Sequence, residues 1–256
     1  MHQASDQALA GKRILVTRPA EQAAKLAALI SQAGGEAVVF PAIEIVEPTN
    51  TQALAALVNT LHQFDFAIFI SPTAVSRAFL HITDWPPELH AAAIGSGSAK
   101  ALRQAGIQQV IAPAQGNDSE ALLALPEMQQ VSGKRILIFR GEDGRELLAN
   151  TLRQRGAQVE YAECYRRAKP QADIAPLLQQ HFDAVVVTSR EGLQNLHDML
   201  GAGWSILQSL PFFVPHPRIA SAANLLEIQQ AIVTTGGDAG CVVAMAQHFH
   251  ASAQRG

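Results

Sequence analysis

Short runs of consecutive apolar residues alternate along this chain with stretches in which apolar residues recur every three or four positions. Runs of four to eight apolar residues are typical of fully buried strands, and the longer periodic stretches predict amphipathic helices. Strands that alternate with helices favour a parallel sheet covered by helices. The strands that we expect are 12–18, 66–71, 92–95, 109–112, 134–140, 183–189, 212–215 and 230–234.

The same order of motifs occurs twice. Lys12–Arg18 (KRILVTR) is repeated as Lys134–Arg140 (KRILIFR), and each copy precedes a helical pattern, 21–33 or 143–155, that stops at a glycine. A glycine directly after the last apolar-periodic residue is a helix C-cap signal. The repetition predicts an α/β protein with two doubly wound domains built from a duplicated unit. Further aligned pairs are 64–71 with 182–189 and 92–99 with 212–219.

Two extended segments, 37–46 and 158–168, occupy equivalent places in the two copies. Both are longer than an ordinary turn between a strand and a helix, so we expect them to connect two domains. The repeat alone leaves two arrangements open. Each domain can be continuous in sequence, or the chain can cross from one domain to the other and return.

Composition and charge narrow the class of protein. The formal net charge is −3, so no overall basic field is present to hold nucleic acid or an anionic membrane, and an anionic ligand must be captured locally. Cys164 and Cys241 are far apart and indicate two reduced, packed thiols. Residues 1–10 show no signal-peptide pattern, and no apolar run has membrane-spanning length. We therefore expect a soluble cytoplasmic protein.

Small, hydroxylated and basic residues follow the expected strands at their carboxyl ends. Doubly wound sheets bind ligands at this edge, where helix N-termini present free N–H groups. For any single Ser or Thr, helix capping explains the residue equally well. Because both halves repeat the pattern, we expect a cleft between the domains that binds anions. The candidate residues are Arg18, Ser71, Pro72, Thr73, Gly95, Ser96, Gly97, Arg140, Gly141, Thr188, Ser189, Arg190, His216 and Pro217.

Familiar cofactor and metal signatures are absent from the sequence. Gly95-Ser96-Gly97 starts like a dinucleotide fingerprint, but Lys100 stands where the third glycine belongs. Gly133-Lys134 precedes a strand, whereas a Walker A loop opens a helix. No GxSxG or HExxH motif occurs, and the histidines are scattered. We therefore expect neither a metal nor another cofactor.

Both tyrosines of the chain, Tyr161 and Tyr165, fall in the second extended segment. Either they pack a connecting strand, or one phenol donates a proton to a leaving oxygen. Arg145, Arg166 and Arg167 likewise can be solvated charges. Arg140 differs from these arginines because it ends an apolar strand at the expected ligand edge.

The central segment 137–148, followed by 152–159 and by Cys164-Tyr165-Arg166-Arg167, resembles uroporphyrinogen-III synthases. Together with matches elsewhere, the resemblance covers almost the whole chain in the family's order. The supporting matches are Ile14 to Pro19, Ser71-Pro72 with Ala74-Val75, Ala93-Ile94-Gly95, and Thr188-Ser189 with Gly192. The chain departs from the repeat at Pro215 to Arg218, which replaces the turn Gly95 to Ser98, and at Leu226, where the first copy has Gly106.

The resemblance implies two flavodoxin-like or Rossmann-like domains joined by a two-stranded connector, with the chain crossing over and back. One domain would comprise 1–37 and 169–256, and the other 41–163. It implies an enzyme without a cofactor that closes the linear tetrapyrrole hydroxymethylbilane into uroporphyrinogen III. The sequence leaves open whether the enzyme works alone or receives its substrate through a transient contact with hydroxymethylbilane synthase, and we expect a monomer because the expected cleft lies within one chain. Tyr165 matches the family's tyrosine that assists departure of the substrate hydroxyl.

Two other classes of protein remain as alternatives. A non-catalytic protein with two α/β domains could clamp a small polycarboxylate. In either class His216, at the expected ligand edge, is a carboxylate ligand or merely an exposed loop histidine. A nucleotide- or NAD-dependent enzyme could use the same fold, since a fold does not fix a function. The incomplete glycine fingerprint argues against this second class.

Overall fold

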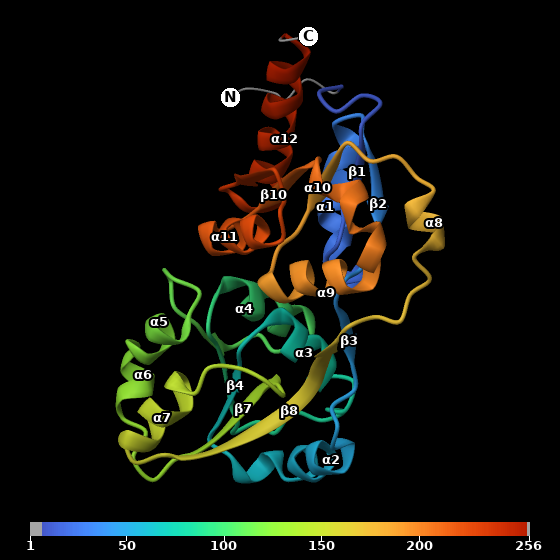
Figure 1. The fold of residues 1–256 in the computed structure, drawn as a ribbon. Coiled ribbons are helices and arrows are strands. Elements are labelled where there is room, and N and C mark those ends of the chain that lie inside the picture. The colour runs from blue at the N-terminus through green and yellow to red at the C-terminus, as the bar shows by residue number, and fades with distance from the viewer. Residues whose placement is uncertain (1–6, 255–256) are drawn as a thin grey trace. The chain divides into compact units, whose positions relative to one another are not determined.

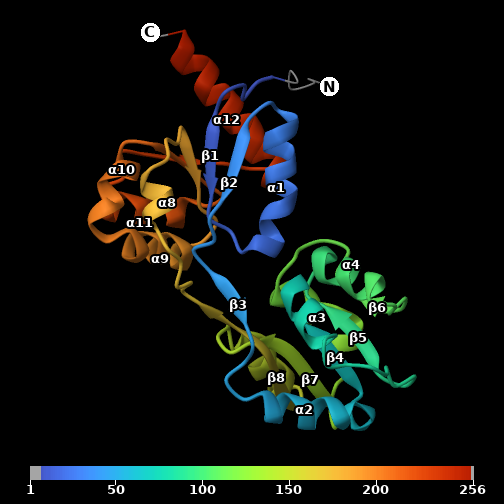
Figure 2. The ribbon, with the colours of Figure 1, turned by 90° about the vertical axis from the view of Figure 1, so that its right-hand side faces the viewer.

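The computed structural model describes residues 7–254, so most of the segment in which we expect no signal peptide lies outside the described residues. The chain forms two compact units (Figures 1 and 2). One comprises Met1–Glu44 with Ala168–Gly256, and the other comprises Ile45–Arg167. Each unit has its own sheet, and the registered strand pairs are parallel. Within residues 7–254 no helix is both long enough and apolar enough to cross a membrane.

The first unit contains a five-stranded sheet in the order β11-β10-β9-β1-β2. Its strands are β1 (Arg13–Val16), β2 (Glu36–Val39), β9 (Ala184–Val186), β10 (Pro211–Val214) and β11 (Gln230–Val233). Ile14 and Val16 pack with α1 and α12 on one face, whereas Leu15 packs with α9 and α11 on the other. The helices are α1 (Ala20–Gln32), α8 (Ala175–Leu178), α9 (Arg190–Leu200), η2 (Gly201–Trp204), α10 (Ser205–Gln208), α11 (Pro217–Leu225) and α12 (Gly237–Ala253).

The second unit contains a six-stranded sheet in the order β3-β8-β7-β4-β5-β6. Its strands are β3 (Glu44–Val46), β4 (Phe66–Phe69), β5 (His90–Ala93), β6 (Val110–Ile111), β7 (Arg135–Gly141) and β8 (Gln158–Ala168). Along β7, Leu137 and Phe139 pack with α2, α3 and α4, whereas Ile136 and Ile138 pack with α5, α6 and α7. The helices are α2 (Thr51–Asn59), η1 (Leu61–Gln63), α3 (Pro72–Ala78), α4 (Ser96–Gln104), α5 (Ser119–Leu123), α6 (Pro126–Gln129) and α7 (Leu147–Gln154).

The amino-terminal edges of the two sheets are held by equivalent contacts. Lys12 Nζ lies 2.9 Å from the Asp183 carboxylate, and Lys134 Nζ lies 2.8 Å from that of Asp65. In each case the backbone N–H of the next residue donates to the same carboxylate. Because β1 pairs with β9 and β7 pairs with β4, each contact joins residues from different halves of the sequence. The chain therefore crosses from one sheet to the other and returns.

All eight expected strands are present: five are shorter than expected, whereas β5, β7 and β10 keep the expected length but are shifted by one or two residues. The unit boundaries fall inside 37–46 and 158–168, but much of both segments belongs to sheets as β2, β3 and β8. The helix expected at 143–155 begins only at Leu147, and the prediction was wrong for its first turn. A Cβ on Gly144 would lie 2.7 Å from the Arg140 guanidinium. The chain before this helix therefore packs against the buried Arg140 side chain and does not form a helical turn.

Candidate active site

Two serines at corresponding carboxyl ends cap the helices that follow. Ser71 Oγ accepts a hydrogen bond from Ala74 N–H at 3.0 Å, and Ser189 Oγ accepts one from Gly192 N–H at 2.9 Å. Pro72 occupies the first turn of α3, where its missing N–H leaves no hydrogen bond unmade. Both serines therefore have the capping role that the sequence left open, and the other N–H groups of each first turn face the carboxyl edge.

The glycine-rich turn before α4 is closed by a side chain from another loop. Asn117 Oδ1 accepts hydrogen bonds from Ser96 N–H at 3.0 Å and from Ser96 Oγ at 3.1 Å. A Cβ on Gly95 would lie 2.4 Å from Asn117 Oδ1, so the turn requires glycine there. Gly97 faces Pro72, with 3.4 Å between its would-be Cβ and the proline ring. The turn thus joins the ends of β4, β5 and β6.

The remaining edge candidates of the first unit are less enclosed. His216 caps α11: its Nδ1 accepts the Arg218 N–H at 3.1 Å, which fixes the ring proton on Nε2 when the imidazole is neutral. His216, Pro217 and Arg190 are exposed, and Thr188 is half-buried. In the second unit, Thr73 is also half-buried. These residues follow strands at the carboxyl ends of the sheets, as the sequence predicts.

Arg18 is committed to an ion pair. Its Nη1 lies 2.5 Å from Asp238 Oδ1 at the start of α12, and both side chains are about one-fifth exposed, 21% and 19%. The sequence predicted Arg18 as a free anion-binding group. Its charge is instead balanced within the first unit, so any role in binding an anion has to compete with Asp238.

Tyr165 owes its position to an irregularity in the sheet. Arg140 pairs with Glu163, but the next residue, Gly141, pairs with Tyr165, so β8 contains one extra residue at Cys164. A bulge of this kind turns the following side chain to the other face of the sheet. Tyr165 therefore packs on the side of α3 and α4, whereas Tyr161 lies on the side of α5 and α7.

The phenol of Tyr165 is almost enclosed. The residue is 5% exposed, its ring lies against Gly141, and its hydroxyl is 3.5 Å from Ser71 Oγ. The backbone N–H of Glu142 donates to the Tyr165 carbonyl at 3.0 Å, which extends the pairing of β7 and β8 beyond the bulge. Tyr165, Gly141 and Ser71, all predicted site residues, thus lie together at the carboxyl edge of the second sheet.

Arg140 lies on the opposite face of the sheet from Tyr165. It is 4% exposed, its Nε donates to the Gly141 carbonyl at 3.1 Å, and its Nη1 lies 2.9 Å from Glu146 Oε1. Its guanidinium carbon lies 4.5 Å from the centroid of the Tyr161 ring. The sequence correctly placed Arg140 at the end of a buried strand. It did not predict that its charge is neutralised there.

Tyr161 and Glu146 complete this arrangement. Tyr161 Oη donates to Glu146 Oε2 at 2.5 Å. Burial, together with this hydrogen bond, raises the pKa of the Tyr161 phenol, while the hydrogen bonds from Tyr161 and Arg140 lower the pKa of Glu146. The Tyr161 hydroxyl is thus held by Glu146 within the second unit.

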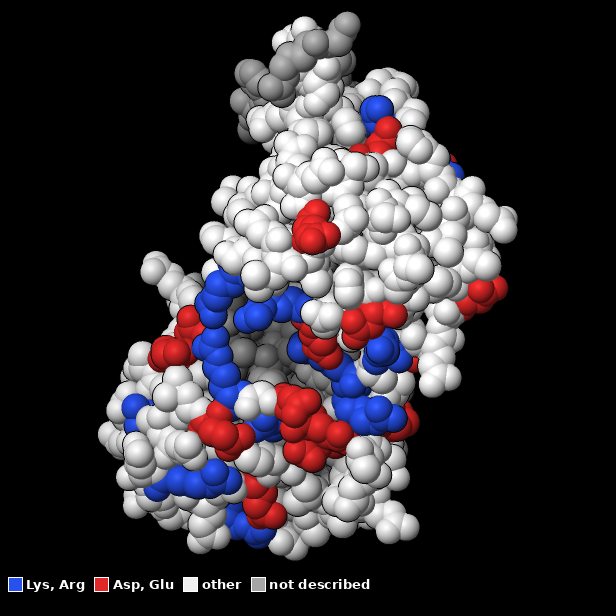
Figure 3. Space-filling model, in the orientation of Figure 1, with Lys and Arg blue, Asp and Glu red and all other residues white. Residues whose placement is uncertain are grey.

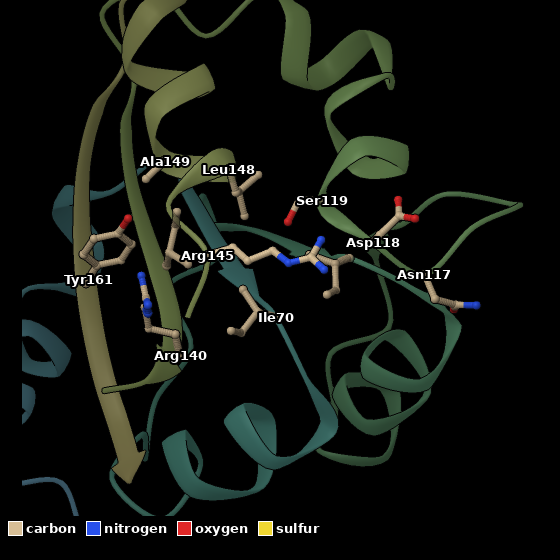
Figure 4. A pocket seen from close by; sticks show the side chains of 11 residues that line it. Ile70, Asn117, Asp118, Ser119, Arg140, Arg145, Leu148, Ala149 and Tyr161 are labelled. Atoms are coloured by element: carbon tan, nitrogen blue, oxygen red, sulfur yellow. The ribbon is translucent and has the colours of Figure 1, made fainter. Parts of the chain in front are cut away.

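A cavity of about 290 Å³ opens beside Arg140 in the second unit (Figure 4). Its apolar part comes from β7, α7 and the residues that directly follow β4 and β5. Its polar part comes from β7, β8, the start of α5 with the loop before it, and the loop before α7. The lining residues are Ile70, Ile94, Asn117, Asp118, Ser119, Ile138, Arg140, Arg145, Leu148, Ala149 and Tyr161. The sequence singled out only Arg140 and, as a solvated charge, Arg145 from this set.

The surface carries charges of both signs, in keeping with the small formal net charge of −3 (Figure 3). On the face drawn in Figure 3, Lys and Arg are interspersed with Asp and Glu and form no single basic field. Among residues 7–254, no group of three or more His, Cys, Asp or Glu side chains is arranged to hold a metal ion.

Comparison with known proteins identifies the family. The family model described as uroporphyrinogen-III synthase HemD matches residues 24–239. The chain belongs to the uroporphyrinogen-III synthase family. It is 39% identical over 191 residues to the uroporphyrinogen-III synthase of Salmonella typhimurium, covering 72% of this chain and 78% of the relative. The enzyme of that name from Escherichia coli is 37% identical over 195 residues, which are 73% of this chain and 79% of the relative.

Solved structures of uroporphyrinogen-III synthases share the fold. The Helicobacter pylori protein matches with a TM-score of 0.59 and 15% identity, covering 93% of this chain and 99% of that one. A mutant of the Thermus thermophilus protein matches with a TM-score of 0.58 and 18% identity, covering 96% and 100%. At this level of identity the likeness supports the fold of this chain, an α/β protein with parallel sheets, and not the roles of single residues.

Proposed function

We propose that this protein is a uroporphyrinogen-III synthase, a lyase that converts hydroxymethylbilane into uroporphyrinogen III and water. The observation that carries the proposal is the match of the family's model to residues 24–239. The enclosed tyrosine at the carboxyl edge of a sheet supports it. The reaction is an isomer-selective dehydration, so it balances without an oxidant or a reductant.

In the proposed reaction, hydroxymethylbilane loses its terminal hydroxyl as water and becomes an azafulvene cation. Attack by the substituted carbon of ring D gives a spiro-pyrrolenine, which fragments and closes again with ring D reversed. Loss of a proton from the ring carbon that forms the last bond gives the neutral product and replaces the proton used to expel the hydroxyl. Because the bilane closes spontaneously to the type I isomer, the protein has to accelerate hydroxyl loss and hold a bent substrate geometry.

Tyr165 is the proposed proton donor to the departing hydroxyl. Its ring is fixed by Gly141 and by the pairing of Glu142 with its carbonyl, and Ser71 Oγ lies near enough to orient the phenol. Burial of this kind restricts the phenol to few orientations, which favours a directed proton transfer. A phenol is a weak acid, so Tyr165 assists the reaction and does not carry all of it.

The substrate carries eight carboxylates, which need partners at the carboxyl edges of the sheets. N–H groups in the first turns of α4, α9 and α11 are proposed to bind some of them, because helix N-termini attract anions. The edge residues proposed to line these sites are Arg18, Ser71, Pro72, Thr73, Gly95, Ser96, Gly97, Arg140, Gly141, Thr188, Ser189, Arg190, His216 and Pro217. Of these, Arg18 and Arg140 already form ion pairs with Asp238 and Glu146, so a substrate carboxylate has to compete with these side chains for them.

The equivalent contacts at Asp65 and Asp183 support the proposal that the two units are copies of one duplicated unit, joined through the segments 37–46 and 158–168. The proposed enzyme works as a cytoplasmic monomer without a cofactor. Because hydroxymethylbilane closes by itself in water, a transient contact with hydroxymethylbilane synthase would shorten its exposure to solvent.

The test is isomer analysis after incubation with freshly generated hydroxymethylbilane. The products are oxidised to porphyrins and separated by chromatography, with a reaction without protein as the control. Predominantly type III porphyrin is expected. Type I alone from folded protein would contradict the proposed activity and favour a binding protein for polycarboxylates.

A further inference from the structure

The cavity beside Arg140 has an apolar floor and a polar rim. Three isoleucines (Ile70, Ile94 and Ile138) lie in or directly after neighbouring strands, and Leu148 and Ala149 come from α7. In Figure 4 the Arg145 side chain extends across the opening toward Ser119, from the loop that follows β7. An apolar cavity with a few convergent polar groups is the usual form of a small-molecule site.

Some of the charged side chains that line the cavity have partners within residues 7–254, and one does not. The Arg140 charge is taken up by Glu146, and Asp118 Oδ1 accepts the Ala121 N–H at 2.8 Å as the cap of α5. Arg145, by contrast, is exposed and has no ion pair in the described part of the chain. Arg145 is therefore the cation available to an incoming carboxylate, with the Ser119 hydroxyl on the same rim.

One wall of the cavity is rigid. The Tyr161 ring lies between two guanidinium groups, with 4.5 Å to Arg140 and 5.4 Å to Arg153, and its hydroxyl is bound to Glu146. A guanidinium group over an aromatic ring is attracted by the electron-rich face of the ring. The wall thus keeps its shape without a ligand, as preorganised binding requires.

The volume limits what can enter. At about 290 Å³ the cavity is near the lower end of the range of small-molecule sites, roughly 300–1,000 Å³. A tetrapyrrole with eight carboxylates is too large, but one of its pyrrole rings with its acetate and propionate chains is a fragment of suitable size. The ring would contact the isoleucines, and a carboxylate would reach Arg145.

We propose that this cavity is a subsite of the second unit that holds one substituted pyrrole ring of the substrate, with Arg145 binding a ring carboxylate. The assignment rests on the proposed function and adds to it a binding residue, Arg145. It also explains why the loop between β7 and α7 departs from a helix, since the loop conformation brings Arg145 over the cavity.

The first test uses a free monopyrrole that carries one acetate and one propionate chain. Isoleucine methyl groups are labelled, and their NMR signals are followed during titration. The signals of Ile70, Ile94 and Ile138 are expected to shift together, while Ile14, buried in the first unit, reports that the protein stays folded. Saturating shifts elsewhere with these three signals unchanged would overturn the subsite.

The second test compares Arg145→Gln with Arg103→Gln, a matched loss of an exposed arginine in the same unit. Loss of a charge-assisted contact is expected to weaken monopyrrole binding and to raise KM for hydroxymethylbilane by about tenfold, with kcat changed by about twofold or less. Arg103→Gln is expected to match the unsubstituted protein. Equal KM values for the two variants would overturn the role of Arg145.

The two proposals fail in distinguishable ways. If the unsubstituted protein forms only type I porphyrin, the proposed function is wrong, whatever the NMR titration shows. If it forms type III porphyrin while the three isoleucine signals stay unchanged, only the subsite is wrong. Type III porphyrin together with shifts that weaken in Arg145→Gln supports both.

Discussion

Gly141 lies so close to Tyr165 that a Cβ on residue 141 would be 2.9 Å from Cε2 of the tyrosine ring. The two residues face each other across β7 and β8 because the bulge at Cys164 shifts the register by one residue. Glycine at 141 and the extra residue in β8 are therefore two parts of one arrangement, which presents the phenol at the carboxyl edge beside Ser71.

Replacing Tyr165 by phenylalanine removes the proposed proton donor and leaves the ring in place. We expect kcat with hydroxymethylbilane to fall about tenfold, which is about 1.4 kcal/mol of barrier, with type III porphyrin still the main product. The measurement is initial rate against substrate concentration with isomer analysis, and the thermal unfolding midpoint serves as the control for folding. Unchanged turnover with the correct isomer would remove Tyr165 from the mechanism.

Gly141→Ala should act through Tyr165. The added methyl group has to displace the ring, so we expect kcat to fall at least as much as in Tyr165→Phe. In a double-mutant cycle the two losses should be far from additive, because both disable the same phenol. Losses that add in full would show that residue 141 acts on something other than Tyr165.

Glu146→Gln removes the carboxylate that balances the buried Arg140 guanidinium. Its partner is only 5% exposed at the side chain, so an uncompensated charge remains away from water and the protein should be less stable. Glu160→Gln is the matched control, because its partner Arg135 is 35% exposed and can be hydrated. Urea denaturation is expected to give a clearly lower midpoint for Glu146→Gln and a nearly unchanged one for Glu160→Gln. The reverse order would contradict this role.

Stability should fall in acid through two equivalent carboxylates. Burial alone raises the pKa of Asp65 and of Asp183, but the hydrogen bonds from Lys134, Lys12 and the backbone outweigh it, and both pKa values lie below the ordinary 3.8. The stabilisation is thus complete above pH 4 or so and is lost as the pH falls through the lowered folded-state values. Asp65→Asn and Asp183→Asn should each flatten the dependence of unfolding free energy on pH below 4, as measured by urea titrations at several pH values. An unaltered slope would show that these carboxylates do not titrate differently on unfolding.

Both thiols should resist alkylation in the folded protein. Burial raises the pKa of Cys164 to about 12 and that of Cys241 to about 11, so almost no thiolate exists at pH 8. Mass spectrometry after iodoacetamide treatment is expected to show no modification at pH 8 without denaturant and two modified cysteines in urea. Rapid labelling of either cysteine under native conditions would contradict its buried position.

The strands could be predicted from the sequence, and so could the carboxyl edge of the sheet at which Tyr165, Gly141 and Ser71 lie. The apolar runs predicted β1 and β7 because buried parallel strands need continuous apolar residues. The sequence did not predict on which face of the sheet each side chain of β8 lies. Simple alternation puts Tyr165 on the same face as Tyr161, and only the bulge, which depends on how β8 pairs with β7, separates them.

The partners of charged side chains were equally inaccessible to sequence reasoning. Arg18 and Arg140 each follow an apolar strand and look alike in the repeat. Their carboxylates, Asp238 and Glu146, come from unrelated positions in the two copies. Asn117, which closes the turn at Gly95, is a loop residue whose role depends on the approach of two distant segments. Only tertiary packing brings these residues together.

The pairing of β1 with β9, a strand much later in the sequence, has a consequence for biosynthesis. The strand β1 leaves the ribosome long before its neighbour β9, which begins only at Ala184. At a synthesis rate of roughly 5–20 residues per second, the nascent β1 waits on the order of ten to thirty seconds for this neighbour. The second unit, Ile45–Arg167, is completely synthesised before β9, so translation favours an order in which the unit that carries Tyr165 folds first. Until β9 is made, the apolar residues of β1 have to be shielded from water by α1 or by chaperones.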